Sequence, residues 1–182
     1  MIRLFKKPYQ RLTDEELMIR VARSREENAF NELYRRYARR LQGFFFRMYD
    51  YNQDAASDAC QELFLKIWTF GNSYKEDAPF KPWLYTIAYN QYKSACRHME
   101  VETTYANEQA ALSEESADND YDIKLDNETM LEALYCILKK LPKDYRTLFA
   151  LRYEEELSIA QVAQILKVPE GTVKSRVHRL LQ

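Results

Sequence analysis

Residues 158–181 read SIAQVAQILKVPEGTVKSRVHRLL. Ser158 and Gln161 stand three positions apart, which is the spacing of a capping box at the start of a helix, and the apolar pattern then continues to Leu166. A short connection follows, and a second periodic stretch begins at Thr172 with several basic residues and no acid. Two short helices joined by a tight turn, the second of them basic, predict a helix-turn-helix.

The second helix of this pair has two distinct faces. Apolar side chains recur at positions i, i+4 and i+7, and we expect them to face the core: Val173, Val177 and Leu180. Polar and basic side chains share the opposite face: Lys174, Ser175, His178 and Arg179. Lysine and arginine on such a face can reach O6 and N7 of guanine in a major groove. The alternative is a plain helical hairpin whose basic face is only solvated.

Two further helices are expected before the helix-turn-helix. An apolar stripe starts after Asn127: Met130, Leu131, Leu134, Ile137, Leu138 and Leu141. Pro142 then suits the first turn of another helix. Three consecutive acids mark the end of that helix: Glu154, Glu155 and Glu156. Consecutive carboxylates point in different directions, and these have no base or metal ligand paired with them, so they do not suggest a catalytic site.

The N-terminal part of the chain also predicts helices. Capping boxes are expected at Thr13 with Glu16 and at Ser24 with Glu27. After the second one, large apolar residues recur every three or four positions: Phe30, Leu33, Tyr34, Tyr37, Leu41, Phe44, Phe45 and Met48. Arginines occupy other positions of the same stretch: Arg35, Arg36, Arg39, Arg40 and Arg47. This pattern predicts a long amphipathic helix with a basic outer face.

The next predicted helix, for which Asp54 is the expected cap, has an ambiguous face. Three of its apolar residues can line the core: Ala59, Leu63 and Ile67. A different arc, beside Phe64 and Trp68, consists of Asp58, Gln61, Glu62 and Leu65. Such an arc is often solvated surface, but apolar residues framed by acids also suit the docking of a partner helix. The spacing alone leaves both interpretations open.

A loop at residues 71–80 separates this helix from one that Pro82 opens. Cations and tyrosines recur every four residues along one face of the new helix: Lys81, Tyr85, Tyr89, Lys93 and Arg97. Asn90 and Tyr92 flank this stripe. Cations for backbone phosphates and rings for stacked bases are what a single-stranded nucleic-acid platform needs. An ordinary amphipathic helix whose tyrosines cover the edge of the core would show the same pattern.

Composition indicates an all-α fold with two helical domains. The 182 residues include 3 glycines and 5 prolines, too few for many hairpin turns, and the glycines are too scattered for a phosphate-binding loop. Residues 100–128 hold ten acids and one lysine, which leaves 26 Lys and Arg against 18 Asp and Glu elsewhere, a net charge of +8. Because the acidic stretch is poor in large apolar residues, we expect 101–126 to be a flexible linker between domains at 1–100 and 127–182.

Cysteine and histidine usage suggests no disulfide framework, metal site or cofactor. The three cysteines are widely separated: Cys60, Cys96 and Cys136. Neither His98 nor His178 has a metal-ligand neighbour at helical spacing. Basic residues and Pro8 interrupt the first eleven residues, so no signal-peptide core fits, and no apolar run approaches the ~20 residues of a membrane span. These features predict a cytoplasmic protein with reduced thiols.

Four stretches resemble the sigma factors of bacterial RNA polymerase, in particular the extracytoplasmic-function (ECF) group of the sigma-70 family. Residues 58–68 (DACQELFLKIW) resemble the polymerase-docking helix of that family, and residues 80–90 (FKPWLYTIAYN) resemble its −10 reading helix. Residues 141–146 (LPKDYR) are similar to the opening of its fourth domain, and residues 168–176 (VPEGTVKSR) to the start of its −35 recognition helix. Lys167 departs from the family pattern, which often has glycine there, so we expect a left-handed backbone at this residue.

The resemblance implies a role for each surface. Core polymerase would be bound, through the clamp helices of its largest subunit, by Asp58, Gln61, Glu62, Leu65 and Trp68. Unpaired −10 DNA would be captured by the 71–80 loop together with Lys81, Trp83, Tyr85, Tyr89, Asn90, Lys93 and Arg97. The −35 duplex would be contacted by Thr172, Lys174, Ser175, Arg176, His178 and Arg179. The implied protein is a sigma factor that directs promoter-specific transcription initiation without catalytic activity of its own, and an anti-sigma factor would hold it inactive.

Other functions differ from this one in testable features. A sigma-like decoy that only binds an anti-sigma factor should lack a basic recognition helix, whereas Lys174, Arg176 and Arg179 are present. A stand-alone helix-turn-helix regulator should bind a palindromic site as a dimer, but no coiled-coil seam is evident. An enzyme would need a paired base or ligand set, which the acids at 154–156 do not have.

Overall fold

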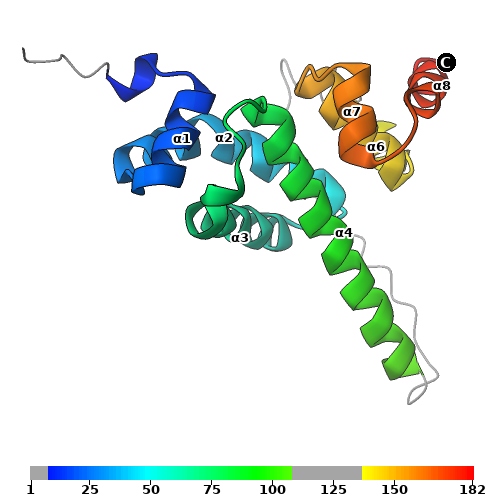
Figure 1. The fold of residues 1–182 in the computed structure, drawn as a ribbon. Coiled ribbons are helices and arrows are strands. Elements are labelled where there is room, and N and C mark those ends of the chain that lie inside the picture. The colour runs from blue at the N-terminus through cyan, green and yellow to red at the C-terminus, as the bar shows by residue number, and fades with distance from the viewer. Residues whose placement is uncertain (1–7, 108–136) are drawn as a thin grey trace, which may run out of the picture.

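The computed structural model describes residues 8–107 and 137–182, and every regular element within these ranges is helical. The N-terminal part contains η1 (Tyr9–Arg11), α1 (Asp14–Ser24), α2 (Glu27–Met48), α3 (Gln53–Phe70), η2 (Gly71–Ser73) and α4 (Phe80–Asn107). The C-terminal part contains α6 (Lys143–Phe149), the π-helical turn η3 (Ala150–Glu154), α7 (Ile159–Leu166) and α8 (Glu170–Leu180). The all-α prediction is confirmed, and the C-terminal helices lie against α2 and one side of α4 (Figure 1).

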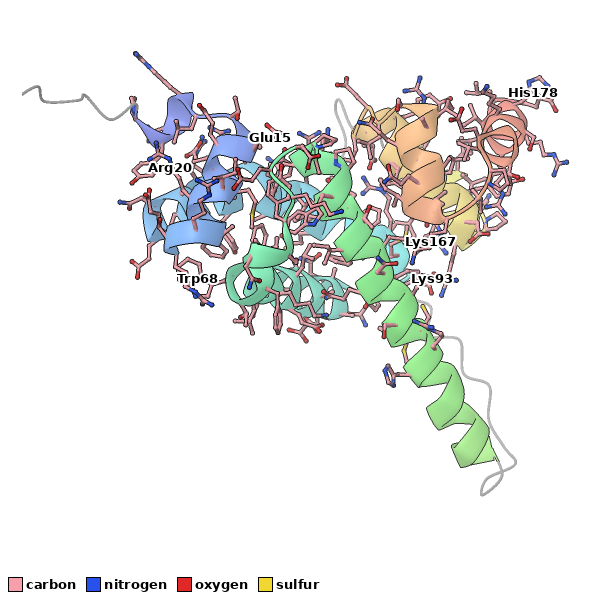
Figure 2. The ribbon with its side chains drawn as sticks, in the orientation of Figure 1. Glu15, Arg20, Trp68, Lys93, Lys167 and His178 are labelled. Carbon is pink, nitrogen blue, oxygen red and sulfur yellow. The ribbon has the colours of Figure 1, made fainter. Side chains whose placement is uncertain are left out.

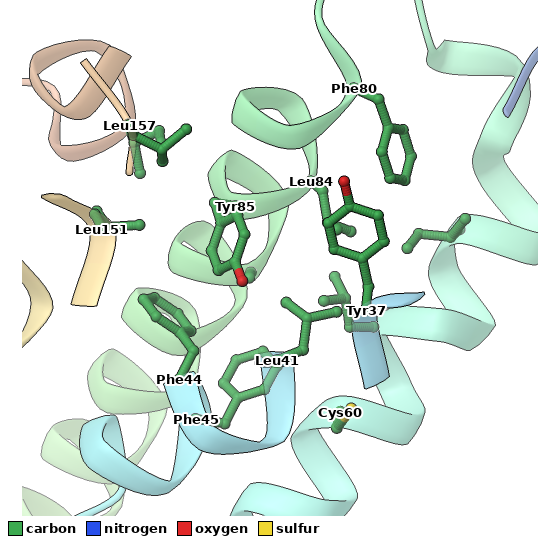
Figure 3. Close-up of a cluster of buried hydrophobic side chains, with 14 of the residues drawn as sticks. Tyr37, Leu41, Phe44, Phe45, Cys60, Phe80, Leu84, Tyr85, Leu151 and Leu157 are labelled. Atoms are coloured by element: carbon green, nitrogen blue, oxygen red, sulfur yellow. The ribbon is translucent and has the colours of Figure 1, made fainter. Parts of the chain in front are cut away.

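The long helix α2 is the centre of the N-terminal bundle and contacts α1, α3 and α4. Its predicted apolar stripe is buried, with Leu41, Phe44 and Phe45 at most 1% exposed. Figure 3 shows these side chains meeting Leu84 and Tyr85 of α4. Burial of such large side chains contributes roughly 1.5–3 kcal/mol each, so this stripe stabilises the bundle.

A charged network joins α1 to α2. The Arg36 guanidinium lies 2.7 Å from the Glu32 carboxylate and 2.6 Å from that of Asp14, which also accepts a hydrogen bond from Tyr37. Arg35 pairs with Glu32 at 2.7 Å. Hydrogen bonds from Arg35 and Arg36 to the ionised carboxylate lower the pKa of Glu32 to about 2. The predicted basic outer face of α2 is therefore partly used to hold α1.

Two predicted capping boxes are confirmed. The Thr13 hydroxyl accepts a hydrogen bond from the Glu16 N–H at 3.1 Å, and the Glu16 carboxylate accepts one from the Thr13 N–H at 2.8 Å. Ser158 and Gln161 make the same reciprocal pair at the start of α7, at 3.2 and 2.9 Å. Each pair satisfies two donors that the helix itself cannot satisfy.

Two other predicted caps are wrong. Ser24 is the last residue of α1 instead of a cap, because α1 and α2 are joined through only two residues and Arg25 reverses the chain with φ 48°. Asp54 lies in the first turn of α3, and the cap is Asn52, whose side-chain oxygen accepts a hydrogen bond from the Ala55 N–H at 3.0 Å.

Helices α7 and α8 form the predicted helix-turn-helix. Val162, Ile165 and Val173 are fully buried between the two helices and their neighbours. The turn passes through Lys167, whose φ of 57° confirms the expected left-handed backbone. Pro169 occupies the N-cap position of α8, and the helix starts at Glu170, two residues before the predicted position.

Replacing Lys167 by glycine should stabilise the protein by about 0.5–1 kcal/mol, because a side chain in the left-handed region costs roughly 1–2 kcal/mol and the extra freedom of glycine in the unfolded chain offsets part of that gain. Urea unfolding of the full chain measures the change. Lys167→Ala keeps the β-carbon and is the matched control, expected to gain nothing. Equal midpoints for all three proteins would contradict the prediction.

Helix α4 is longer than the sequence predicted. The flexible linker was expected from residue 101, but α4 continues to Asn107, since neither glycine nor proline interrupts residues 83–107 and helix propagation is favourable once started. The rest of the predicted linker, and residues 127–136 of the helix expected after it, lie outside the described residues. Within the described ranges, no helix combines the length and apolar character that crossing a membrane requires.

Cys60 and Cys96 are free thiols, while Cys136 lies outside the described residues. Cys60 is 6% exposed, and its sulfur lies 3.6 Å from the Ala38 carbonyl oxygen. Burial raises the pKa of the Cys60 thiol to about 11, so that it stays protonated and unreactive near neutral pH.

Candidate nucleic-acid interface

The outward face of α8 carries the side chains predicted to read duplex DNA. Four of them are exposed: Lys174, Ser175, His178 and Arg179. Val173, on the opposite face, is fully buried. Figure 2 shows His178 on the outer side of α8, away from the rest of the chain. A rigid helix thus presents two cations and two hydrogen-bonding groups to solvent, as contact with base edges requires.

Arg176 and Thr172 lie at the edge of this face. Arg176 turns back toward α6, with Nη1 3.4 Å from the Asp144 carboxylate. The Thr172 carbonyl accepts a hydrogen bond from the Ser175 hydroxyl at 3.0 Å, and both Thr172 and Arg176 are half-buried. Side chains at the rim of a recognition helix are placed for phosphate contacts more than for bases.

The loop before α4 is held in place from several sides. The Phe80 N–H donates a hydrogen bond to the Glu15 carboxylate at 2.9 Å, and the Tyr74 hydroxyl donates one to the Ala78 carbonyl. The rings of Tyr74 and Trp83 meet edge to face with their centroids 5.0 Å apart. Burial raises the pKa of Tyr74 to about 12, so its hydroxyl remains a donor. The predicted base-capturing loop is therefore preformed beside Trp83.

At Tyr85 the structure agrees with the second interpretation of the α4 stripe, in which its tyrosines cover the edge of the core. Its side chain is fully buried and packs against Phe44, with the ring centroids 5.4 Å apart. Figure 3 shows Tyr85 between the core of the bundle and two leucines of the C-terminal part, Leu151 and Leu157. In this conformation the Tyr85 ring cannot stack on a base, because the second domain covers this turn of α4.

Further along α4 the stripe lines a groove of about 740 Å³ between α4 and the helix-turn-helix. Four of the predicted residues form the α4 side: Tyr89, Asn90, Lys93 and Arg97. Lys167 and Arg176 lie on the facing side, and Figure 2 shows Lys167 close to Lys93. Four cations and one acid, Asp144, line this groove, so its net charge is positive and attracts anions.

Lys81, the first residue of the stripe, is paired with an acid of the second domain. Its Nζ lies 3.2 Å from the Glu155 carboxylate and also donates to the Glu155 carbonyl. The same carboxylate lies 2.9 Å from Arg40, and the neighbouring Glu154 pairs with Arg47, which is buried instead of lying on the predicted outer face. Sequence reasoning left these acids unpaired because their partners stand 74 to 115 positions away.

The arc predicted as a docking face on α3 is open to solvent. Its four central members are all exposed: Asp58, Gln61, Glu62 and Leu65. Leu65 is 64% exposed, while Glu62 is held at 2.7 Å by Lys66 and at 3.0 Å by Gln91. An exposed leucine surrounded by fixed polar groups resembles the anchor of a protein interface.

Trp68 lies at the edge of this arc and is half-buried. Its ring packs against Phe30 with the centroids 5.1 Å apart, and the Arg25 guanidinium lies 6.0 Å from the ring centre. Beside it, Phe70 is 64% exposed and lines a groove of about 260 Å³ that Ile87 also lines. Sequence reasoning missed Phe70, because one aromatic residue at a helix end has no periodicity to reveal it.

Comparisons with known proteins show what this chain is similar to. A family model described as Sigma-70 region 2 matches residues 33–100, and one described as Sigma-70, region 4 matches residues 131–182. An ECF RNA polymerase sigma-E factor of Haemophilus influenzae is 31% identical over 180 residues, which cover 93% of this chain and 92% of that protein. The ECF RNA polymerase sigma factor SigW of Bacillus subtilis is 28% identical, covering 88% and 89%.

Two solved structures share the fold. CnrH, in complex with the cytosolic domain of CnrY, matches with a TM-score of 0.63 at 20% identity, over 92% of this chain and 91% of CnrH. The sigma factor RpoE of Bartonella quintana, in complex with the anti-sigma factor NepR, matches with a TM-score of 0.62 at 24% identity, over 83% and 91%. At these identities the likeness concerns the helical fold.

Proposed function

This chain belongs to the ECF group of the sigma-70 family, and we propose which of its surfaces carries each step of the function. It is a sigma factor that binds core RNA polymerase and directs promoter-specific transcription initiation. In our proposal it acts in the cytoplasm, the polymerase performs the RNA synthesis, and the chain itself supplies no catalytic residue.

We assign −35 recognition to α8, and its exposed polar face is the observation that carries the proposal. Lys174 and Arg179 would donate to guanine in the major groove, with Ser175 and His178 completing the base contacts. Thr172 and Arg176, at the rim, would contact phosphates. The buried valine on the opposite face supports this assignment, because it fixes the rotation of α8 relative to its domain.

We assign −10 recognition to the preformed loop and the α4 stripe. An extruded base would lie at the rim formed by residues 71–80 and Trp83, where the half-buried indole ring could stack on a flipped nucleotide. Tyr89 and Asn90 would contact neighbouring bases, while Lys93 and Arg97 would follow the backbone of the strand. Lys81 and Tyr85, which the second domain covers here, would join this surface when it is uncovered.

We assign core-polymerase docking to the exposed arc of α3. Leu65 would be the apolar anchor against the clamp helices of the largest subunit, and Asp58, Gln61 and Glu62 would surround it with polar contacts. Trp68 would extend the contact at the edge of the arc. From the family alone we also propose an anti-sigma factor as a second protein partner.

Run-off transcription on a library of random promoter fragments tests the function. Purified core polymerase with this protein should produce transcripts that core alone does not, and their templates should share two spaced elements. Binding to core without such transcripts would favour the decoy that engages only an anti-sigma factor. Failure to bind core at all would refute the proposed function.

A further inference from the structure

The groove between α4 and the helix-turn-helix has the size of a small-molecule site. Its volume is about 740 Å³, within the roughly 300–1,000 Å³ of most ligand pockets. Residues of α4 form one side, and residues of α6, α7, α8 and the turn before α8 form the other. Leu166 and Val168 add an apolar part to an otherwise polar lining.

The charge of this groove is unbalanced. Four cations line it against one acid, which leaves a net charge of +3: Lys93, Arg97, Lys167 and Arg176 against Asp144. Within residues 8–107 and 137–182, the first three of these cations take part in no ion pair. Arg176 lies 3.4 Å from Asp144, with side chains 30% and 63% exposed, and such an exposed, long pair is weak.

Other contacts between the two parts of the chain are neutralised. The Glu155 carboxylate lies between Arg40 and Lys81, and Asp50 pairs with Arg146. Cations gathered without such acids repel one another, so a bound anion would relieve an unfavourable energy in the groove. Because several cations meet there, an anion with several charges gains more than one with a single charge.

The rest of the α4 side suits a base and its phosphates. The half-buried Tyr89 offers an aromatic ring, on which any base can stack, and Asn90 and Ser94 offer hydrogen-bonding groups. Burial and the nearby Asp144 carboxylate raise the pKa of Tyr89, so its hydroxyl remains a donor. Lys93 follows one helical turn later, where it would meet phosphates attached to a base on Tyr89.

We propose that this groove is a binding site for a small oligophosphate, and that a nucleoside polyphosphate is the ligand that uses all of its lining. The two arginines would bind phosphate oxygens through paired N–H donors, and the two lysines would add point charges. The base would stack on Tyr89. This site needs neither polymerase nor promoter DNA, so its existence does not depend on the proposed function.

Isothermal titration calorimetry of the full-length protein tests the site. At an ionic strength of about 0.1 M, and without magnesium so that the phosphates keep their charge, ATP should bind with a micromolar dissociation constant. Inorganic triphosphate should bind several-fold more weakly, because it lacks the base. AMP and orthophosphate should bind at least about tenfold more weakly than ATP, because each forms fewer charged hydrogen bonds.

Lys167→Ala tests the cations, with Lys174→Ala as the matched control. Each variant removes one positive charge from an exposed position of the C-terminal part, but Lys174 lies on the outer face of α8 and outside the groove. Lys167→Ala should weaken the binding of ATP and of triphosphate about tenfold, and the control should stay within about twofold of the wild type.

Arg97→Ala removes a cation from the opposite side of the groove and decides the question if Lys167→Ala does not fold. It should also weaken both ligands about tenfold. Equal losses in a groove variant and in the Lys174→Ala control would mean that net charge alone attracts the ligand, and would overturn the proposal. Wild-type affinity in the folded groove variants, or no saturable binding of ATP or triphosphate, would overturn it as well.

Tyr89→Leu distinguishes a nucleotide from an inorganic oligophosphate. It should reduce the affinity for ATP to that for triphosphate and leave the affinity for triphosphate unchanged, since only the nucleotide has a base to stack. If the wild type binds triphosphate as tightly as ATP, the ligand is an inorganic oligophosphate and the contact of Tyr89 with a base is refuted.

A bound oligophosphate should also compete with single-stranded DNA, because Tyr89, Lys93 and Arg97 are assigned to both. This consequence rests on the proposed function. ATP at about ten times its dissociation constant should weaken the binding of a fluorescein-labelled single strand about tenfold, and AMP at the same concentration at most about twofold. Unchanged affinity for the strand would refute the shared site. A wild-type protein that does not initiate with core refutes the proposed function, while calorimetry alone decides the ligand site.

Discussion

Leu65→Glu should weaken binding to core polymerase by about 100-fold or more, which is the largest single-residue effect we expect. Leu65 is 64% exposed at the centre of the α3 arc, so its apolar side chain is buried only when a partner covers it. Truncating an interface anchor costs about 2–4 kcal/mol, and glutamate adds the desolvation of a new charge next to Asp58 and Glu62. Titration of labelled chain with purified core measures the change.

Folding should not be affected, because an exposed substitution of this kind usually changes stability by less than about 0.5 kcal/mol. Gln10→Glu is the matched control: it adds the same charge at an exposed position of the same domain, outside the proposed docking arc. The control should bind core like the wild type. Binding of Leu65→Glu within threefold of wild type, with an unchanged unfolding midpoint, would contradict the assignment of this arc.

The combined change Lys174→Ala and Arg179→Ala should reduce transcription from a promoter with a −35 element by about 30-fold or more. Each good contact to a base edge is worth about 1–3 kcal/mol, and α8 presents both cations to solvent. The fold should persist, since Val173 and the rest of the buried face are unchanged. Run-off transcription under subsaturating conditions, with core binding measured in parallel, provides the readout.

Lys139→Ala with Lys140→Ala is the control for this double variant. It removes two positive charges from exposed positions of the same domain, outside α8, and should cost only a small, salt-dependent part of the affinity. Equal losses in the two double variants would mean that net charge, and not base recognition, drives binding. Loss of core binding in the α8 variant would assign these residues another role.

The parts of the fold that depend on near neighbours in the sequence were predictable. The capping boxes at Thr13 and Ser158 involve residues three positions apart, and both are formed. The two faces of α8 follow from helical periodicity alone, and the left-handed turn at Lys167 follows from its place in the motif. Ser24 could have capped the second helix or ended the first one. The two-residue connection between α1 and α2 decided that it ends α1.

The candidate −10 surface was predictable only in part. Spacing placed Tyr89, Lys93 and Arg97 on one face of a helix with Asn90 beside it, and the structure brings all four to one wall of a groove. It could not show that Tyr85, on the same stripe, is buried by leucines more than sixty positions later in the chain. Periodicity identifies residues that share a face of a helix, but not which part of that face another domain covers.

Sequence alone determined the helices, the helix-turn-helix and the family of this protein, because these depend on short-range spacing and on motifs read in order. Only the tertiary structure decided that Glu154 and Glu155 pair with Arg47, Arg40 and Lys81, and that the C-terminal domain covers Tyr85 on the α4 stripe. Consecutive acids have the same local pattern whether they are solvated or buried. Their role depends on which cations the folded chain brings to them from distant positions, and local spacing does not encode that choice.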